Sequence, residues 1–291
     1  MSGELSLDMT TSDRISRWLS ISWPGVLLLI CVFIPSLLLV RVSLAPMDIA
    51  TLWGDGITFS SFDQFGDYGV MRALGWSLFY SLGVSILGIA VAFPLTWLIT
   101  GMNRKLQTLW LIFLLSTLSL SDVLISFSWQ VMLSHKQWVS QLLIHLGLMA
   151  KTASLIPSVG TVFCSLLYIT VPFSVLLLFP ALSRLDRSLI EAAHTMGATP
   201  LRSFFGLAIP LSKKNLFVSL ALSFISTMGA YTAPLVLGRP EDWPLAVIIG
   251  QVALSAQNFP LASSMSLLLL AVTLVVASLL FSLSRRGKSG C

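Results

Sequence analysis

The sequence predicts an all-α integral membrane protein with six transmembrane helices. Apolar residues make up 56% of its 291 residues and charged residues only 10%, whereas about a quarter of the residues are charged in a typical soluble protein. The charges are clustered, and several of the segments between them exceed the roughly 20 residues that a helix needs to cross a bilayer. A soluble fold of this size could not cover its surface with so few charges.

The six predicted spans are the apolar segments 18–40, 73–103, 106–134, 152–183, 215–238 and 261–283. The third is interrupted by one charge, Asp122. Two further apolar segments, 135–151 and 243–258, are too short or too interrupted by small residues to cross alone, and we expect them to lie at the membrane interface.

The distribution of Lys and Arg predicts that both termini are cytoplasmic, because cytoplasmic loops of membrane proteins are enriched in these residues. With the N-terminus inside, 12 of the 17 basic residues fall in cytoplasmic segments. The predicted organisation is a cytoplasmic flank (1–17), a six-helix domain (18–284) with a long cytoplasmic loop (184–214), and a short tail (285–291).

The loop 184–214 carries a helix–turn–helix pattern. A first helix starts near Asp186 and includes Glu191, Ala192 and Ala193, and Gly197 ends it, because glycine readily adopts the left-handed conformation found just past a helix end. Pro200 then opens a second short helix, since proline is favoured at a first helical position. Paired alanines allow close approach of a partner, and a glutamate offers one ion pair. The pattern favours docking over catalysis.

These residues resemble the EAA signature of ABC-importer permeases: Glu-Ala-Ala, three residues, glycine, then nine residues to an aliphatic-x-aliphatic-Pro. The positions in register with that signature are Glu191, Ala192, Ala193, Gly197, Leu207, Ile209 and Pro210. An ordinary amphipathic interface helix is the alternative interpretation. The segments 229–238, 248–250 and 258–263 are similar to the spermidine/putrescine branch of these permeases, which also has iron(III) and opine-type relatives. The chain has Asp122 and Ser126 where polyamine permeases have asparagine and arginine, so the substrate of this chain is open at this point.

The resemblance implies a type I ABC importer (MetI-like) permease fold and a transport subunit without catalytic or metal-binding residues. It also implies four kinds of partner: a second permease chain, two ATPase subunits that bind ATP and Mg, a periplasmic solute-binding protein, and the bilayer of a bacterial inner membrane. The residues expected to transmit ATPase closure are Glu191, Ala192, Ala193, Gly197, Pro200, Phe204, Ile209 and Pro210.

Asp122 is the residue that we expect to face the transport pathway. An ionisable group inside a bilayer normally faces the bundle interior or a wet cavity. Asp122 could attract a cationic substrate, with Trp129 or Tyr231 supplying an aromatic face. Alternatively, Asp122 bonds the neighbouring Ser119, Ser121 or Ser126 and holds helices together.

Two other classes of function are weaker alternatives. A secondary transporter or channel would need charge relays or inverted repeats within the membrane, and Asp122 is the only charge of that kind within the predicted spans. An intramembrane enzyme would need a Ser/His pair or metal-spaced His and Glu residues at one depth, and the sequence places none there. The chain also lacks a Walker phosphate loop, so an importer needs a separate ATPase.

Overall fold

The computed structural model describes residues 11–48, 52–134, 156–185, 188, 193, 195–197 and 199–286. Every regular element in these ranges is helical. The main helices are α1 (Thr11–Ser43), α3 (Tyr68–Gly101), α4 (Arg104–Leu118), α5 (Asp122–Met132), α7 (Val159–Leu182), α10 (Ile209–Met228), α12 (Leu245–Leu254) and α13 (Phe259–Arg286). Shorter elements are α2 (Ser60–Asp63), η1 (Gln64–Gly66), α9 (Pro200–Ser203), η2 (Phe204–Ala208), α11 (Thr232–Leu237) and η3 (Pro240–Asp242).

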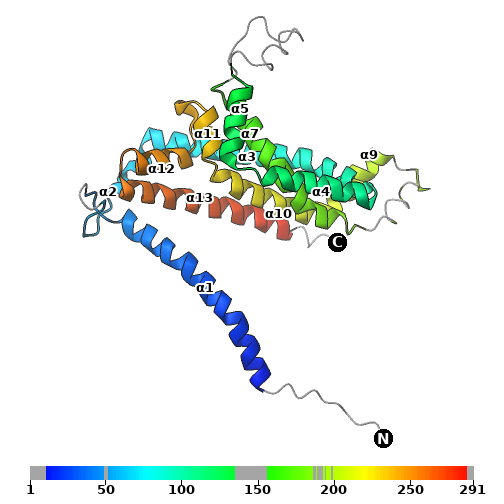
Figure 1. Ribbon diagram of the computed structural model, residues 1–291, viewed down its shortest axis with the longest axis horizontal. Helices are drawn as coiled ribbons and strands as arrows, with labels where there is room; N and C mark the ends of the chain where they lie inside the picture. The colour runs from blue at the N-terminus through cyan, green and yellow to red at the C-terminus, as the bar shows by residue number, and fades with distance from the viewer. Residues whose placement is uncertain are drawn as a thin grey trace, which may run out of the picture.

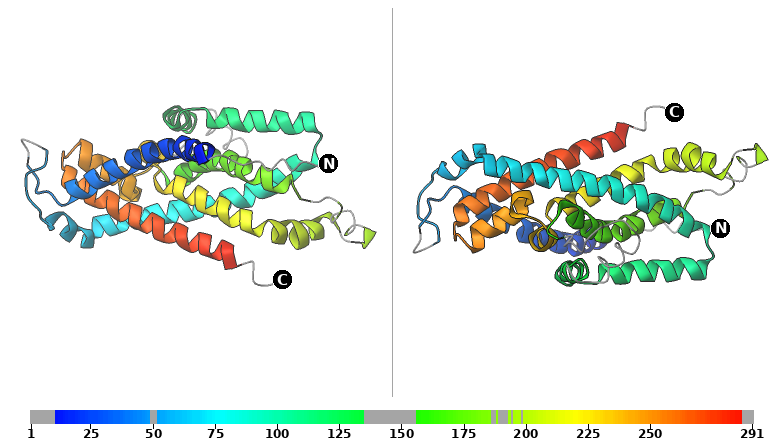
Figure 2. Two further views of the ribbon diagram at one scale, coloured as in Figure 1. Left: turned by 90° about the horizontal axis from the view of Figure 1, so that it is seen from below. Right: turned by 90° about the horizontal axis from the view of Figure 1, so that it is seen from above.

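Long helices lie side by side along the long axis of the molecule, and α1 leaves this body at an angle (Figure 1). Both views in Figure 2 show α3, α4, α7, α10 and α13 running lengthwise. Five helical segments are long and apolar enough to span a membrane, or six if the bent pair α4 and α5 counts as one span. The sequence-based prediction of six apolar spans agrees with this range.

Two predicted spans differ from the structure. The third span is not one helix, because α4 and α5 meet at a bend of 88°. The fifth runs over Phe204–Met228, so it begins 11 residues before the predicted residue 215. It also ends at Met228 instead of residue 238, and α11 is a separate short helix beyond it.

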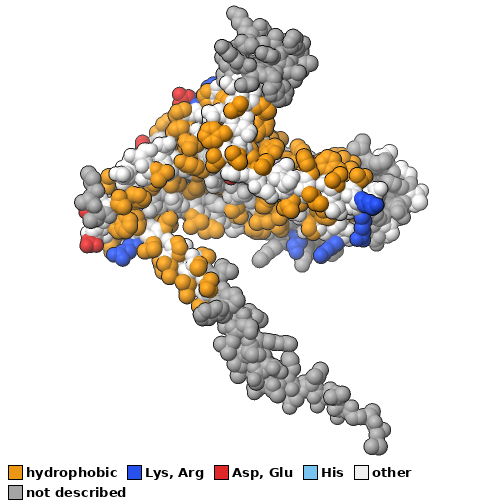
Figure 3. Space-filling model, in the orientation of Figure 1, with side chains coloured by type: hydrophobic (Ala, Val, Ile, Leu, Met, Phe, Trp, Pro, Cys, Tyr) orange, Lys and Arg blue, Asp and Glu red, His pale blue; other side chains and the backbone are white. Residues whose placement is uncertain are grey.

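The two ends of the bundle differ in charge. We call them the α9 end, which also holds the start of α4, and the α12 end, which also holds α2. Figure 3 shows Lys and Arg side chains mostly at the α9 end, with acidic side chains at the opposite end. At the α9 end the last turns of α13 meet the start of α10, where the Ser284 hydroxyl donates to the Lys214 carbonyl at 3.4 Å. This distribution agrees with the predicted placement of the α9 end on the cytoplasmic side, which stays a prediction.

The core of the bundle is built from three clusters along α3. One, near the α12 end, joins α3 to α10, α12 and α13 around Phe224 and Leu245. A second, near the α9 end, joins α3 to α4, α7 and α10 around Val175 and Leu178. The third joins α3 to α7 and α11 around Tyr80.

The helices α3 and α7 approach closely because α3 has glycine where they meet. A Cβ added to Gly88 would lie 2.9 Å from Thr170 Cγ2, and one added to Gly83 would lie 2.5 Å from Phe163 Cζ. Membrane helices lack a strong hydrophobic drive to associate, so small residues at the contact contribute packing that larger residues would prevent. The glycines therefore allow α3 and α7 to form a closely packed pair, which contributes to two of the three clusters.

Several predicted segments lie wholly or partly outside the described residues. They include the interfacial segment 135–151, the first ten residues of the N-terminal flank and the tail after Arg286. The other predicted interfacial segment contains α12, whose Leu245 and Val247 are buried in the bundle.

Candidate functional site

The turn of the predicted docking motif is formed by Gly197 and Thr199. Ser188, Ala193 and Thr195 are helical, and Gly197 has a φ of +84°, in the left-handed region predicted for it. The Thr199 hydroxyl accepts a hydrogen bond from the Arg202 backbone N–H at 3.3 Å, and its carbonyl accepts from Ser203 N–H at 3.0 Å. Thr199 therefore caps α9, which begins at Pro200 as predicted.

Within the first helix of this motif, Glu191 and Ala192 lie outside the described residues, whereas Ala193 is 9% exposed. Met196, which follows the helix, is 83% exposed. The chain thus changes from a buried small residue to a fully accessible apolar one within four positions.

The second helix of the motif is not separate, which corrects the expectation of a short independent helix. It continues from α9 through η2 into α10. The segment η2 is a π-helical turn in which Ile209 N–H donates to the Phe204 carbonyl, five residues earlier. Pro210 explains the wider turn, because proline has no N–H and its ring clashes with the carbonyl four residues before it. Phe204, Ile209 and Pro210 are therefore part of the fifth span.

Phe204 joins this continuous helix to α3. Its ring lies 5.3 Å from that of Phe93 and 6.0 Å from that of Trp97, centroid to centroid. Phe205, the next residue, is 64% exposed. Phe204 therefore packs the start of the fifth span against α3. The amino-acid pattern alone did not reveal this contact, because the two aromatic residues of α3 are more than 100 positions away.

A second group of residues surrounds the bend between α4 and α5. Ser121 caps α5 by accepting from Val123 N–H, and Asp122 is the exposed first residue of that helix. The Ser126 hydroxyl donates to the Asp122 backbone carbonyl at 2.8 Å, and the Ser119 hydroxyl donates to Leu115. Among the described residues, none donates a hydrogen bond to the Asp122 carboxylate. The alternative in which these serines hold the carboxylate is therefore not what the described structure contains.

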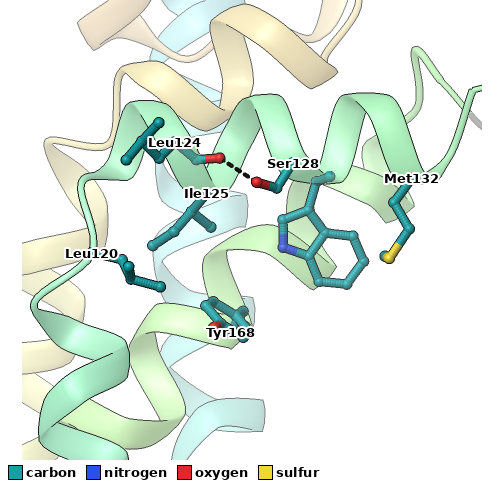
Figure 4. Close-up of a pocket in the computed structure, with 7 residues that line it drawn as sticks. Leu120, Leu124, Ile125, Ser128, Met132 and Tyr168 are labelled. Atoms are coloured by element: carbon teal, nitrogen blue, oxygen red, sulfur yellow. Dashed lines mark hydrogen bonds between the residues drawn. The ribbon is translucent and has the colours of Figure 1, made fainter.

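The predicted pathway residue Trp129 lines a cavity of about 520 Å³ in this corner (Figure 4). The other lining residues are Leu120, Leu124, Ile125, Ser128, Met132 and Tyr168. Tyr168 comes from α7, and its ring meets that of Trp129 at 6.4 Å between centroids and 77° between planes. We call this cavity the α5 pocket. Sequence reasoning missed Tyr168, because it reaches the pocket from a different helix.

Tyr231, the third predicted pathway residue, does not line the α5 pocket. It is partly buried at the start of α11, and a Cβ added to Gly250 of α12 would lie 2.5 Å from its Cε2. Its neighbour Ala230 belongs to the same cluster as Trp129. Tyr231 therefore packs between α11 and α12, and its predicted place in the transport pathway stays a prediction, as do those of Asp122 and Trp129.

A recess of about 660 Å³ lies between the α3–α4 turn and the end of α7. Its lining is polar and includes Asn103, Arg104, Thr108 and Ser183. Gln107 closes the turn by donating through Nε2 to the carbonyls of Thr100 and Met102 at 3.1 and 2.8 Å. Arg104, which lines this recess, is one of the basic residues at the α9 end.

Comparison with known proteins identifies the family of the chain that carries the docking motif and the α5 pocket. Residues 85–286 match the family described as "Binding-protein-dependent transport system inner membrane component". The chain belongs to this family. The matched residues include α4, α5, the Gly197 turn, the Phe204 contact and α10, so both candidate regions lie within the family's part of the chain.

Two relatives of this permease are spermidine/putrescine transport system permease proteins PotB. The one from Escherichia coli (strain K12) is 23% identical over 83% of this chain and 88% of its own length. The one from Haemophilus influenzae is 24% identical over 95% of this chain and 94% of its own length. The permease is therefore a multi-pass inner-membrane component of an ABC importer, a transport subunit and not an enzyme.

Solved structures show the same fold. Two crystal structures of bacterial alginate ABC transporters, one of them in complex with a periplasmic protein, contain chains with TM-scores of 0.78 and 0.76 to this permease, at 18% and 17% identity. They cover 94% and 96% of this chain, and the matches extend over 98% and 99% of theirs. A chain of the MetNI methionine ABC transporter matches with a TM-score of 0.58, 15% identity and coverage of 76% and 97%. The expected MetI-like permease fold is confirmed.

Proposed function

We propose that this permease forms half of the translocation pathway for a small, cationic, polyamine-like solute. The observation that carries this proposal is the exposed carboxylate of Asp122 beside an aromatic pocket that has no charged lining residue. The resemblance to polyamine permeases over most of the chain supports the same solute class.

The position of Asp122 supports a face turned toward water or toward another subunit. The 15 residues of α4 place the bend about 22 Å from the α9 end, at 1.5 Å per residue. A carboxylate at that depth in contact with lipid would cost a few kcal/mol. If the solute pathway passes the α4–α5 bend, the Asp122 carboxylate contacts water or a cationic solute and not lipid, so this free-energy cost does not arise.

The proposed assembly contains a second, homologous permease chain, two ATPase subunits that bind ATP and Mg, and a periplasmic solute-binding protein. The structure of the alginate importer with its periplasmic protein supports an assembly of this kind. A single docking motif per chain also favours a pair of permeases. The assembly would be bistable, with each state favoured by its own nucleotide-dependent contacts.

We propose that the segment 187–196 receives ATPase closure and passes it on through Gly197, Thr199, α9 and η2. The buried Ala193, the positive φ of Gly197 and the Thr199 cap of α9 support a defined turn where this segment meets α9. Glu191 would supply the ion pair with the ATPase, and Phe204, Ile209 and Pro210 lie where the element joins the membrane helix.

The solute class can be tested on the cognate binding protein. We expect thermal-shift measurements to show stabilisation by spermidine or putrescine and none by opines, amino acids or iron(III), because a ligand that binds only the folded state raises the melting temperature. Stabilisation by one of the other solutes, without a response to polyamines, would overturn the polyamine assignment and keep the importer architecture.

A further inference from the structure

The polar recess between the α3–α4 turn and the end of α7 lies where two helices change from polar to apolar surface. On α4, Arg104 and Lys105 begin the helix, and exposed apolar side chains follow along it. On α7, the apolar segment ends at Leu182, and the exposed Ser183 and Arg184 follow. A bilayer changes from headgroups to hydrocarbon at such a boundary. The recess, which we call the α4 recess, therefore lies at the depth expected of lipid headgroups.

The lining of the α4 recess contains a cation and no anion. Arg104 lines the recess, and none of the other lining residues is acidic. Within the part of the chain that the structure describes, no carboxylate pairs with the Arg104 guanidinium. Two more exposed cations, Lys105 and Arg184, each follow a lining residue directly in the chain. The recess therefore favours an anion, in agreement with the basic side chains at this end of the bundle (Figure 3).

The polar groups of the α4 recess suit a phosphate that carries a hydroxylated substituent. A guanidinium binds phosphate oxygens through two parallel hydrogen bonds. The Thr108 hydroxyl already donates to the Arg104 carbonyl at 2.9 Å, and the Ser183 hydroxyl donates to the Pro180 carbonyl at 3.2 Å. The oxygens of these two hydroxyls can therefore accept hydrogen bonds from a ligand. Phosphate and hydroxyl groups occur together in the glycerol headgroup of phosphatidylglycerol.

The size of the α4 recess exceeds what a phosphate ion requires. Its volume of about 660 Å³ is about 20 times the roughly 30 Å³ that one water molecule occupies in the liquid. Gln107 closes one side, because its Nε2 donates to the Thr100 and Met102 carbonyls and joins α4 to the end of α3. The recess thus has room for a whole headgroup beside Arg104.

The apolar part of the lining continues onto a surface that suits acyl chains. Leu111 and Phe179 line the α4 recess beside its polar residues. Farther along α4, Leu109 is 63% exposed, Ile112 59% and Leu115 57%. A molecule with a charged head and hydrocarbon tails would therefore contact polar groups in the recess and apolar side chains along the helix.

We propose that the α4 recess binds the headgroup phosphate of an anionic phospholipid, in the leaflet at the α9 end of the bundle. Arg104 binds the phosphate, the Thr108 and Ser183 oxygens accept from the headgroup hydroxyls, and the acyl chains lie along α4. The bound lipid contacts both α4 and the end of α7, so it stabilises the folded permease. The inference is independent of which solute the importer carries.

The test is lipid binding to the purified permease–ATPase complex in detergent, measured by native mass spectrometry. Phosphatidylglycerol and phosphatidylcholine with identical acyl chains are compared. We expect phosphatidylglycerol to bind about fivefold more tightly, because each basic residue near the bilayer surface favours an anionic lipid by about that factor. Arg104→Gln should remove most of this preference, and Arg104→Lys should retain it.

Two further variants separate the recess from the general charge of the α9 end. Ser183→Trp adds bulk at the recess without changing the charge, so it should lower the binding of phosphatidylglycerol. Lys213→Gln is the matched control, because it removes one exposed cation of α10 outside the recess, and it should leave the preference in place. Equal binding of the two lipids, or equal losses in Arg104→Gln and Lys213→Gln, would overturn the proposal. Undiminished binding in Ser183→Trp would overturn the recess as the site.

A second arm distinguishes a lipid from free phosphate. The melting temperature of the complex is measured with added phosphatidylglycerol and, separately, with inorganic phosphate at constant ionic strength. We expect a rise with the lipid that Arg104→Gln reduces, and no such rise with phosphate. A rise with phosphate that is equally large and equally dependent on Arg104 would contradict the lipid assignment. Size-exclusion profiles and basal ATP hydrolysis matching the unmutated complex show that each variant is folded.

Discussion

Gly197 is the position of the docking motif whose backbone conformation most restricts the residue type. Its φ of +84° lies in the left-handed region, where a Cβ crowds the following carbonyl. An added Cβ would meet no atom within 4 Å, so backbone conformation and not space requires glycine there. The sequence predicted this turn for two reasons. Gly197 comes just after the predicted first helix, and Thr199-Pro200 is a typical start for the next one.

We expect Gly197→Ala to destabilise the turn by about 1 kcal/mol and to lower solute-stimulated ATP hydrolysis and uptake in proteoliposomes. Basal ATP hydrolysis should remain, because the ATPase sites are on other subunits. The control is Gly206→Ala in η2, where an added Cβ also meets open space and φ lies outside the left-handed region. Equal losses in the two variants would show that conformation at Gly197 is unimportant.

Also at the residue scale, the sequence identified two of the residues around the α4–α5 bend and missed the third. Asp122 and Trp129 were predicted from their own helix, as a charge in an apolar run and a nearby aromatic. Tyr168 was not, since its place in the pocket depends on how α7 packs against α5. Tyr231 was predicted from the same aromatic chemistry, and it packs against Gly250, outside the α5 pocket.

Among the helices, the bend at Asp122 is the feature that hydropathy could not predict. The segment 106–134 contains no Gly or Pro, so it has no residue that by itself breaks a helix. The break falls at Ser119–Ser121, where hydroxyls bond to backbone groups at the end of α4 and the start of α5. Such local bonds allow a helix to break but also occur in continuous helices. Whether the segment bends therefore depends on how the surrounding helices pack against it.

The early start of the fifth span has a different cause. The charges at Arg202, Lys213 and Lys214 end the apolar segment in a hydropathy analysis, although the backbone remains helical through them. Long basic side chains can extend away from a helix toward water, so charge marks the depth of a helix and not its end.

The contact of Phe204 with Phe93 and Trp97 connects η2 to α3, and its loss should uncouple the two helices. Phe204→Leu removes both ring contacts from a partly buried site. We expect a loss of about 1 kcal/mol or more in stability and a fall in transport per ATP hydrolysed. The measurements are the melting temperature of the complex and the uptake-to-hydrolysis ratio.

Phe205→Leu is the matched control, since Phe205 is the adjacent residue and is 64% exposed. It contacts Phe204 at 5.2 Å but is not among the residues packed into the α9-end cluster. A ratio that falls equally in both variants would mean that the aromatic contact with α3 does not carry the motion.

For the whole molecule, the permease has a packed body and two regions that we propose contact other molecules during transport. The α3–α7 pair and the clusters around it form the body. We propose that the α5 pocket faces a solute and that the Gly197 turn, at the end predicted to be cytoplasmic, faces the ATPase. These two regions are joined through Phe204, α3 and α7, because Tyr168 and the partners of Phe204 sit on the same packed pair of helices.

The most direct test of this account is a cross-link between the docking motif and the ATPase. Met196 is 83% exposed beside the Gly197 turn, and Leu254 is 74% exposed at the end of α12, on the opposite end of the bundle. Met196→Cys and Leu254→Cys would be introduced into a complex from which the native cysteines have been removed, and treated with a short thiol-to-amine cross-linker.

The account predicts that Met196→Cys joins the permease to the ATPase subunit, with a yield that changes when ATP is bound, and that Leu254→Cys does not. An ATPase that co-purifies but cross-links equally at both positions, or at neither, would contradict it.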